Sequence, residues 1–139
     1  MGRNIREVMT DRLITLPTEA SIVDAGRSMR ENDIGDVVVM EGDRFFGLVT
    51  DRDIVVRAIA EGKDPSNTRL RDVTTEDVRT LAPDSTVAEA VDIMRSAAVR
   101  RIPVLDGDRL VGIVSIGDLA QQEDEGSALA DISQAPPND

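Results

Sequence analysis

Two pairs of polar residues have the spacing expected of a small binding site. Thr50 precedes Asp53 by three positions, and Ser115 precedes Asp118 by the same interval. Each hydroxyl can cap a helix that starts at the next residue, where unpaired backbone N–H groups and the helix dipole favour an anion. The same hydroxyl can donate to a phosphate or sugar oxygen. The alternative is that each pair is only a capping box, worth about 1 kcal/mol of helix stability.

The composition excludes most catalytic chemistry. The chain has no Cys and no His, so it cannot form a disulfide, a zinc finger, a thiolate nucleophile or a Ser-His-Asp triad. The remaining ligand types suit only a hard cation such as Mg²⁺. We therefore expect no catalytic residues and no metal site, and a protein that binds and does not catalyse.

Length and charge narrow the class of protein further. A chain of 139 residues with a formal net charge of −11 can bury one modest core. Residues 121–139 contain five acids and no Lys or Arg, and the rest still carries −6. This acidity repels phosphate backbones, which argues against a nucleic-acid binder. No apolar run is long enough to span a membrane and no leader opens the chain, so we expect a soluble cytoplasmic protein.

An internal repeat organises the chain. A shift of 65 positions aligns residues 5–54 with 70–119 without a gap and gives 15 identical pairs in 50. We predict a first repeat at 1–62, a polar linker at 63–69, a second repeat at 70–122 and an acidic, disordered tail at 123–139.

Each repeat predicts the same β-α-β-β-α order of elements. Capping boxes at Ser21 and Thr86 start a helix in each repeat, and a four-residue turn joins two apolar strands behind it. Short strands around 13–16 and 78–81 precede these helices, and a second helix follows Thr50 or Ser115. The fold class is α+β. Since a three-stranded sheet with two helices cannot close its own core, we expect the repeats to pack about a pseudo-two-fold axis.

The repeated motif resembles a known family. Residues 46–54 (FGLVTDRDI), 101–105 (RIPVL) and 110–119 (LVGIVSIGDL) contain a glycine, two apolar residues, Ser or Thr, and an aspartate three positions later. The chain is similar to a tandem pair of cystathionine-β-synthase (CBS) domains, also called a Bateman module, over about residues 5–122. The resemblance implies an adenine nucleotide in the cleft between the repeats, with Asp53 and Asp118 accepting hydrogen bonds from the ribose hydroxyls.

The two predicted sites differ in charge. Arg100 and Arg101 precede a strand of the second repeat, where related proteins place basic residues near phosphate, whereas the first repeat has Gly35 and Asp36. Arg52 could compensate in the first repeat. We expect the second site to bind the phosphorylated ligand. The ligand contacts that we expect are Thr15, Leu16, Thr50, Arg52, Asp53, Thr80, Leu81, Arg100, Arg101, Ile102, Pro103, Ser115 and Asp118.

Two functions remain open from the sequence. The first is a regulatory module that senses AMP, ADP, ATP or S-adenosylmethionine, with or without Mg²⁺, and signals to a separate, unidentified partner protein. The resemblance also implies a homodimer. The second is a ligand-free dimerisation or protein-interaction module in which both clefts are degenerate.

Overall fold

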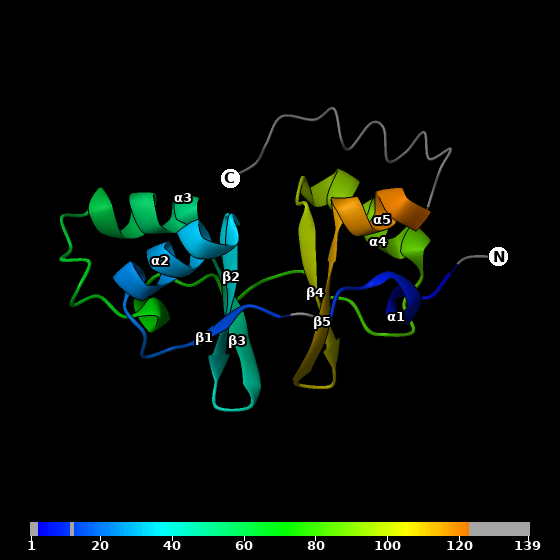
Figure 1. The fold of residues 1–139 in the computed structure, drawn as a ribbon, viewed down its shortest axis with the longest axis horizontal. Helices are drawn as coiled ribbons and strands as arrows, with labels where there is room; N and C mark the ends of the chain where they lie inside the picture. Colours follow the sequence, from blue (N-terminus) through cyan, green and yellow to red (C-terminus); the bar gives the residue numbers. More distant parts are fainter. Residues whose placement is uncertain (1–2, 12, 123–139) are drawn as a thin grey trace. The chain divides into compact units, whose positions relative to one another are not determined.

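The computed structural model describes residues 3–11 and 13–122, and the predicted tail at 123–139 lies outside this range. The fold is mixed α and β, as predicted, and the chain forms two compact units (Figure 1). Among the described residues, 14–78 form one unit, and 3–11, 13 and 79–122 form the other. The units are groups of residues in contact, and their boundaries do not coincide with those of the sequence repeats. The residues that precede the first strand of each repeat belong to the unit of the other repeat.

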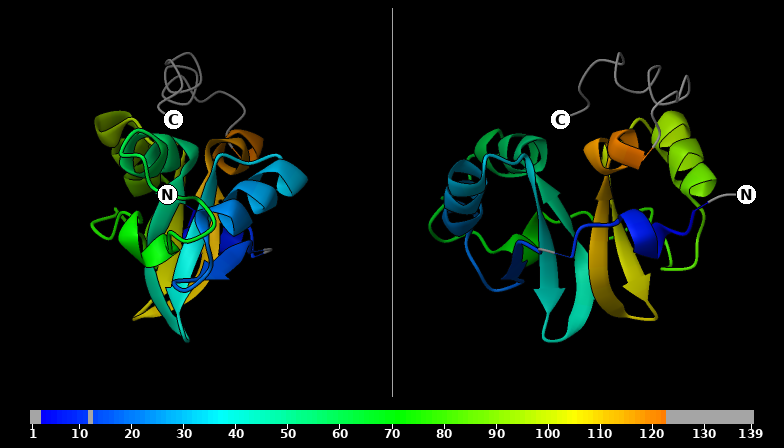
Figure 2. Two further views of the ribbon diagram at one scale, coloured as in Figure 1. Left: turned by 90° about the vertical axis from the view of Figure 1, so that its left-hand side faces the viewer. Right: turned by 45° about the vertical axis from the view of Figure 1, so that its right-hand side comes forward.

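The unit of residues 14–78 contains a three-stranded sheet. Its strands are β1 (Thr15–Pro17), β2 (Asp36–Glu41) and β3 (Arg44–Thr50), in the order β1-β2-β3. β1 is parallel to β2, and β2 is antiparallel to β3. Helices α2 (Ile22–Asn32) and α3 (Asp51–Ile54) lie on one face of this sheet (Figures 1 and 2). A π-helical turn (Val55–Ile59) continues α3, and a 3₁₀ turn covers Leu70–Asp72.

The other unit repeats this pattern around a two-stranded sheet. β4 (Arg101–Asp106) pairs antiparallel with β5 (Arg109–Ser115), and α4 (Val87–Ala97), α5 (Ile116–Gln122) and α1 (Ile5–Val8) accompany them. The short strand predicted around 78–81 is reduced to a single parallel bridge between Leu81 and Val104. The segment is held there by hydrogen bonds from Leu81 N to the Pro103 carbonyl (3.0 Å) and from Leu105 N to the Leu81 carbonyl (2.8 Å).

Local sequence explains where the first helix of each repeat begins. The Ser21 hydroxyl accepts from Asp24 N at 3.1 Å, and the Asp24 carboxylate accepts from Ser21 N at 3.1 Å. Thr86 and Glu89 form the same reciprocal pair at 3.1 and 2.7 Å. Both predicted capping boxes are therefore confirmed, and each satisfies backbone N–H groups that the first turn of a helix leaves unpaired.

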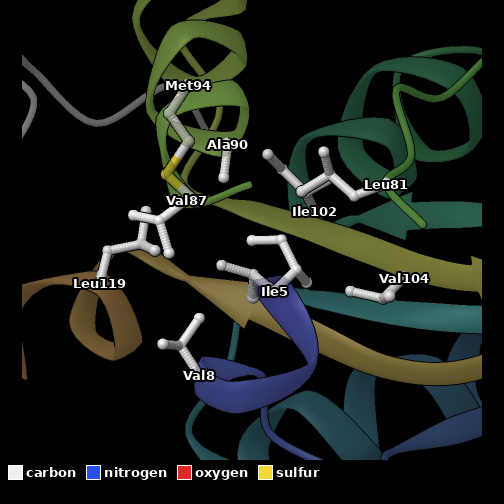
Figure 3. Packing of buried hydrophobic residues seen from close by; sticks show 10 residues of the cluster. Ile5, Val8, Leu81, Val87, Ala90, Met94, Ile102, Val104 and Leu119 are labelled. Atoms are coloured by element: carbon white, nitrogen blue, oxygen red, sulfur yellow. The ribbon is translucent and has the colours of Figure 1, made fainter. Parts of the chain in front are cut away.

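Each core is completed by a segment that precedes the other repeat's first strand. In the unit of the second repeat, Ile5 and Val8 of α1 pack with residues of α4, β4 and α5 (Figure 3). In the unit of the first repeat, Leu70 and Val73 pack with α2 and the sheet. In each unit, apolar side chains of a short helical turn from outside the repeat complete the core.

Residues 63–69, predicted as a polar linker, are packed within the unit of residues 14–78. Thr68 is buried, and its carbonyl accepts a hydrogen bond from Ile22 N at 3.1 Å. The Arg69 guanidinium donates to the Glu19 carbonyl at 2.7 Å. Hydrogen bonds to the backbone and within the segment satisfy its polar groups, so a polar sequence can pack here. Composition alone does not distinguish such a segment from a linker.

Arg71 joins the 3₁₀ turn to the rest of its unit. Its guanidinium lies 2.7 Å from a Glu41 carboxylate oxygen and 3.3 Å from one of Glu19, and it donates to the Thr18 hydroxyl at 3.2 Å. It also lies over the Phe46 ring, 5.5 Å from the centroid. The hydrogen bonds to Glu41 and then to Glu19 raise the pKa of Arg71 above its usual value. This network fixes the segment that leads to Thr75.

Candidate functional site: two hydroxyl and carboxylate pairs

Both hydroxyl and carboxylate pairs form the predicted capping boxes. The Ser115 hydroxyl accepts from Asp118 N at 3.1 Å, and the Asp118 Oδ2 accepts from Ser115 N at 3.0 Å. Thr50 and Asp53 make the same two hydrogen bonds, each 3.0 Å long. The capping interpretation is thus confirmed. It leaves a ligand role open, because each hydroxyl uses only a lone pair in this bond and keeps its proton for another acceptor.

Each carboxylate also has a threonine beside it that is distant in the sequence. This threonine comes from the residues that precede the first strand of the other repeat. The Thr10 hydroxyl donates to both oxygens of Asp118, at 3.0 and 3.1 Å. The Thr75 hydroxyl lies 3.5 Å from Oδ2 of Asp53. Sequence reasoning missed both residues, although Thr10 and Thr75 are themselves an identical pair of the 65-residue repeat.

The motif glycines explain how these threonines reach the carboxylates. Thr10 pairs with Ile113 through Thr10 N to the Ile113 carbonyl (2.8 Å) and Ile113 N to the Thr10 carbonyl (2.9 Å). A Cβ at Gly112 would lie 3.0 Å from Met9 Cγ and 3.1 Å from the Thr10 carbonyl oxygen. A side chain at Gly112 would therefore require Met9 and the segment that crosses β5 to shift.

The same crossing occurs in the other unit. Leu48 and Thr75 exchange two backbone hydrogen bonds of 3.0 Å, and the segment passes over Gly47. In both units the motif glycine therefore leaves room for a segment that pairs with the next residue of the strand.

The surroundings of the two carboxylates differ. At Asp53, the Arg57 Nε lies 3.8 Å from Oδ1, and the Arg57 guanidinium also donates to the Val73 carbonyl at 3.2 Å. The repeat places Gln122 at the position equivalent to Arg57. Asp118 thus accepts hydrogen bonds from the neutral Thr10 hydroxyl, and Asp53 has the Arg57 cation nearby.

The strand register brings the predicted basic residues to Ser115. Arg101 lies directly opposite Ser115 in the β4–β5 pair, and Ile116 N donates to the Arg100 carbonyl at 2.9 Å. The first repeat has the same backbone arrangement with other residues: Asp36 lies opposite Thr50, and Asp51 N donates to the Gly35 carbonyl at 3.0 Å. The predicted charge difference is thus positioned next to each hydroxyl.

The remaining predicted ligand contacts differ in how exposed they are. Ile102 is fully buried and Leu81 is 6% exposed, and both side chains belong to the core that Figure 3 shows. Thr15 is exposed and Leu16 partly buried in β1, Thr80 precedes the Leu81 bridge, and Pro103 lies opposite Ile113 in β4. Arg52 is exposed in the first turn of α3, one residue before Asp53.

Neither a metal cluster nor a membrane-spanning helix occurs in the part of the chain that the structure describes. Residues 3–11 and 13–122 contain no group of three or more His, Cys, Asp or Glu side chains that could hold a metal ion. Over the same ranges, no helix has the length and apolar character to cross a membrane.

Comparison with known proteins identifies the repeat. A family model for the CBS domain matches residues 5–59 and 70–124. The CBS domain-containing protein YhcV of Bacillus subtilis (strain 168) is 33% identical over 134 residues, which cover 94% of this chain and 95% of that protein.

Two solved structures have the same fold. A crystal structure of Hypoxic Response Protein I with two coordinated zinc ions has a TM-score of 0.79 and 30% identity, and covers 87% of this chain and 99% of its own. A hexameric CBS-CP12 protein from bloom-forming cyanobacteria has a TM-score of 0.71 and 29% identity, and covers 89% and 74%. With both repeats matched by the family model, the chain belongs to the CBS-domain family and contains two CBS domains in tandem.

Proposed function

We propose that this protein is a regulatory module that binds an adenosyl compound at the second repeat and transmits the bound state to a separate partner protein. Ser115 and Asp118 recognise the ribose, and Arg100 and Arg101 bind the phosphate. CBS-domain pairs are generally regulatory, and the absence of His and Cys from the sequence leaves no imidazole or thiol for catalysis.

One observation supports this assignment most strongly: the β4–β5 register sets Arg101 opposite Ser115, three residues from Asp118. Guanidinium groups form bidentate, charge-assisted hydrogen bonds with phosphate, and a carboxylate accepts two hydrogen bonds from a vicinal diol. In the first repeat the equivalent Asp36 would repel a phosphate. We therefore propose a phosphorylated ligand at the second repeat, and at the first repeat either no ligand or one with less negative charge.

The ligand class is AMP, ADP or ATP, or S-adenosylmethionine, with Mg²⁺ accompanying a polyphosphate. Zinc is not part of the proposal. Hypoxic Response Protein I coordinates two zinc ions, but this chain has neither His nor Cys, the side chains that zinc prefers in proteins.

Calorimetric titration with adenosine, AMP and ATP tests the proposal, with the double variant R100G/R101D, which gives the second repeat the residues of the first. We expect wild-type protein to bind AMP more tightly than adenosine, and the double variant to lose this preference. In a thermal-shift assay, a ligand at 100 times its Kd adds about 2.7 kcal/mol of stability, a shift of several degrees.

Two aspartate variants assign the site. Asp118→Ala should weaken nucleotide binding more than Asp53→Ala, and both remove one capping interaction, so each is a control for the structural loss of the other. If wild-type protein binds none of the nucleotides, with or without Mg²⁺, the sensor function is rejected.

A ligand-free interaction module is the second candidate, and a specific surface favours it. Val55, Val56 and Ile59 are 56%, 46% and 50% exposed and are the only exposed large hydrophobic side chains among the described residues. We propose that they contact a second copy of the chain, as the related CBS-CP12 protein is hexameric. Val55→Glu should then lower the mass measured by analytical ultracentrifugation, whereas Ala120→Glu, at the equivalent position of the second repeat, should not.

A further inference from the structure

The Thr10 hydroxyl occupies a specific position at the Asp118 carboxylate. It lies between the two oxygens, 3.0 Å from Oδ1 and 3.1 Å from Oδ2. A diol that donates one hydrogen bond to each oxygen approaches the carboxylate at the same position between the two oxygens, which we call the fork. The remaining hydrogen bond of Oδ2, from Ser115 N at 3.0 Å, comes from the capping box and leaves the fork to Thr10.

The first repeat lacks this arrangement. The Thr75 hydroxyl lies 3.5 Å from Oδ2 of Asp53, at the outer limit of a hydrogen bond, and makes no second contact to Oδ1. Oδ1 of Asp53 has Arg57 at 3.8 Å instead. The fork of Asp53 is therefore not closed by a hydroxyl, and the two threonines differ although the repeat makes them equivalent.

We propose that Thr10 competes with the ligand for Asp118: its hydroxyl stands in for the diol in the ligand-free protein and sets the affinity for ligands that carry one. This inference rests on the proposed function of the second repeat. Thr10 is exposed, so a ligand can reach the hydroxyl and displace it by rotation about the Cα–Cβ bond.

The competition is effective because Thr10 is held in place before any ligand arrives. Two backbone hydrogen bonds to Ile113, of 2.8 and 2.9 Å, fix the threonine main chain, and Met9 lies over Gly112 beside it. The hydroxyl therefore reaches Asp118 without the translational and rotational cost that a free ligand bears on binding. A ligand has to break this hydrogen bond before its own hydroxyls can bind the carboxylate, so its net affinity is lower by the free energy of the Thr10 hydrogen bond.

Thr10→Val tests the proposal, because valine keeps the shape and the backbone pairing and removes only the hydroxyl. AMP should bind Thr10→Val roughly three- to tenfold more tightly than wild type, the range expected for the net contribution of one ordinary hydrogen bond at an exposed position. Thr75→Val, the matched control, should change AMP affinity less than about twofold, because Thr75 lies at Asp53 of the first repeat, where we propose no phosphorylated ligand. Thr10→Ser restores the hydroxyl and should return the wild-type affinity.

A ligand without the diol separates competition from a general change in the site. 2′,3′-Dideoxy-AMP cannot donate to the fork, so Thr10→Val should leave its affinity unchanged while that of AMP rises. Unchanged or weaker AMP binding by Thr10→Val, or an equal gain for the dideoxy compound, overturns the competition and leaves the proposed function standing. If AMP, ADP, ATP and S-adenosylmethionine bind neither wild type nor Thr10→Val, the proposed function and this inference both fall.

Discussion

Replacement of Gly47 by alanine tests the segment that crosses the motif glycine of the first repeat. A Cβ at Gly47 would lie 2.7 Å from Thr74 Cγ2, and the Thr75 carbonyl oxygen would be closer still. The carbonyl belongs to the backbone and accepts from Leu48 N at 3.0 Å, so it cannot rotate away. The segment has to move off β3 as a whole, and both hydrogen bonds of the bridge weaken.

Two other glycines provide matched comparisons. Overpacking costs about 1–3 kcal/mol, and the stiffer unfolded chain of an alanine variant offsets about 0.4–1 kcal/mol. Because the nearest neighbour at Gly47 is a backbone carbonyl, the upper part of this range applies, and we expect Gly47→Ala to lose about 2 kcal/mol. Gly112→Ala should lose about 1 kcal/mol or less, because its nearest neighbour is the flexible Met9 side chain. A Cβ added at Gly26 in α2 would have nothing within 4 Å, so Gly26→Ala should gain about 0.5–1 kcal/mol.

Urea unfolding followed by far-ultraviolet circular dichroism measures these differences, since the chain has no Trp or Tyr for fluorescence. A loss of about 2 kcal/mol lowers the midpoint by about 1 M urea. The expected order of midpoints is Gly26→Ala, wild type, Gly112→Ala, Gly47→Ala. A Gly47→Ala variant as stable as wild type would refute the crossing, because no accommodating movement of a backbone carbonyl is free of cost.

Three other perturbations test the core, a helix cap and the composition. Ile5→Ala should lower the free energy of unfolding by about 2–5 kcal/mol, as Ile5 is fully buried in the core of a unit to which sequence order does not assign it; an exposed Glu7→Ala change is the control. Ser21→Ala should cost about 1 kcal/mol by calorimetry through loss of the α2 capping box, and a cost near zero would contradict the hydrogen bond to Asp24 N. Equimolar Zn²⁺ should change the melting temperature by less than about 1 °C, in the absence of His and Cys.

Sequence patterns were sufficient for the elements that depend on neighbouring residues. Hydroxyl and carboxylate side chains three positions apart predict the starts of α2, α3 and α4, because a capping box needs only those two residues. Both hairpins also follow, since a glycine within a four-residue turn joins two apolar runs. Gly42 and Gly107 have φ of 62° and 66°, a conformation that favours glycine.

The partners of each carboxylate could not be predicted in the same way. Thr10 lies 108 positions from Asp118, and nothing in its local pattern indicates a partner at that distance. The repeat itself obscures the answer, because Thr10 and Thr75 are identical and so are Gly47 and Gly112. From sequence alone, pairing within a repeat and pairing with the other repeat are chemically equivalent.

Sheet order accounts for the pairing that the fold adopts. Leu48 gives both its N–H and its carbonyl to Thr75, so the Thr75 segment extends the sheet beyond β3, on the side away from β2. β1 lies at the opposite edge in the order β1-β2-β3. The residues directly before β1 enter the sheet at the β1 edge and would have to cross β2 to pair with β3. The residues that follow α3, which include Thr75, reach the β3 edge without crossing a strand. The free edge beside each motif glycine is thus filled by residues that precede the other repeat, and this is why a threonine so distant in sequence reaches the carboxylate at which we propose that the ligand binds.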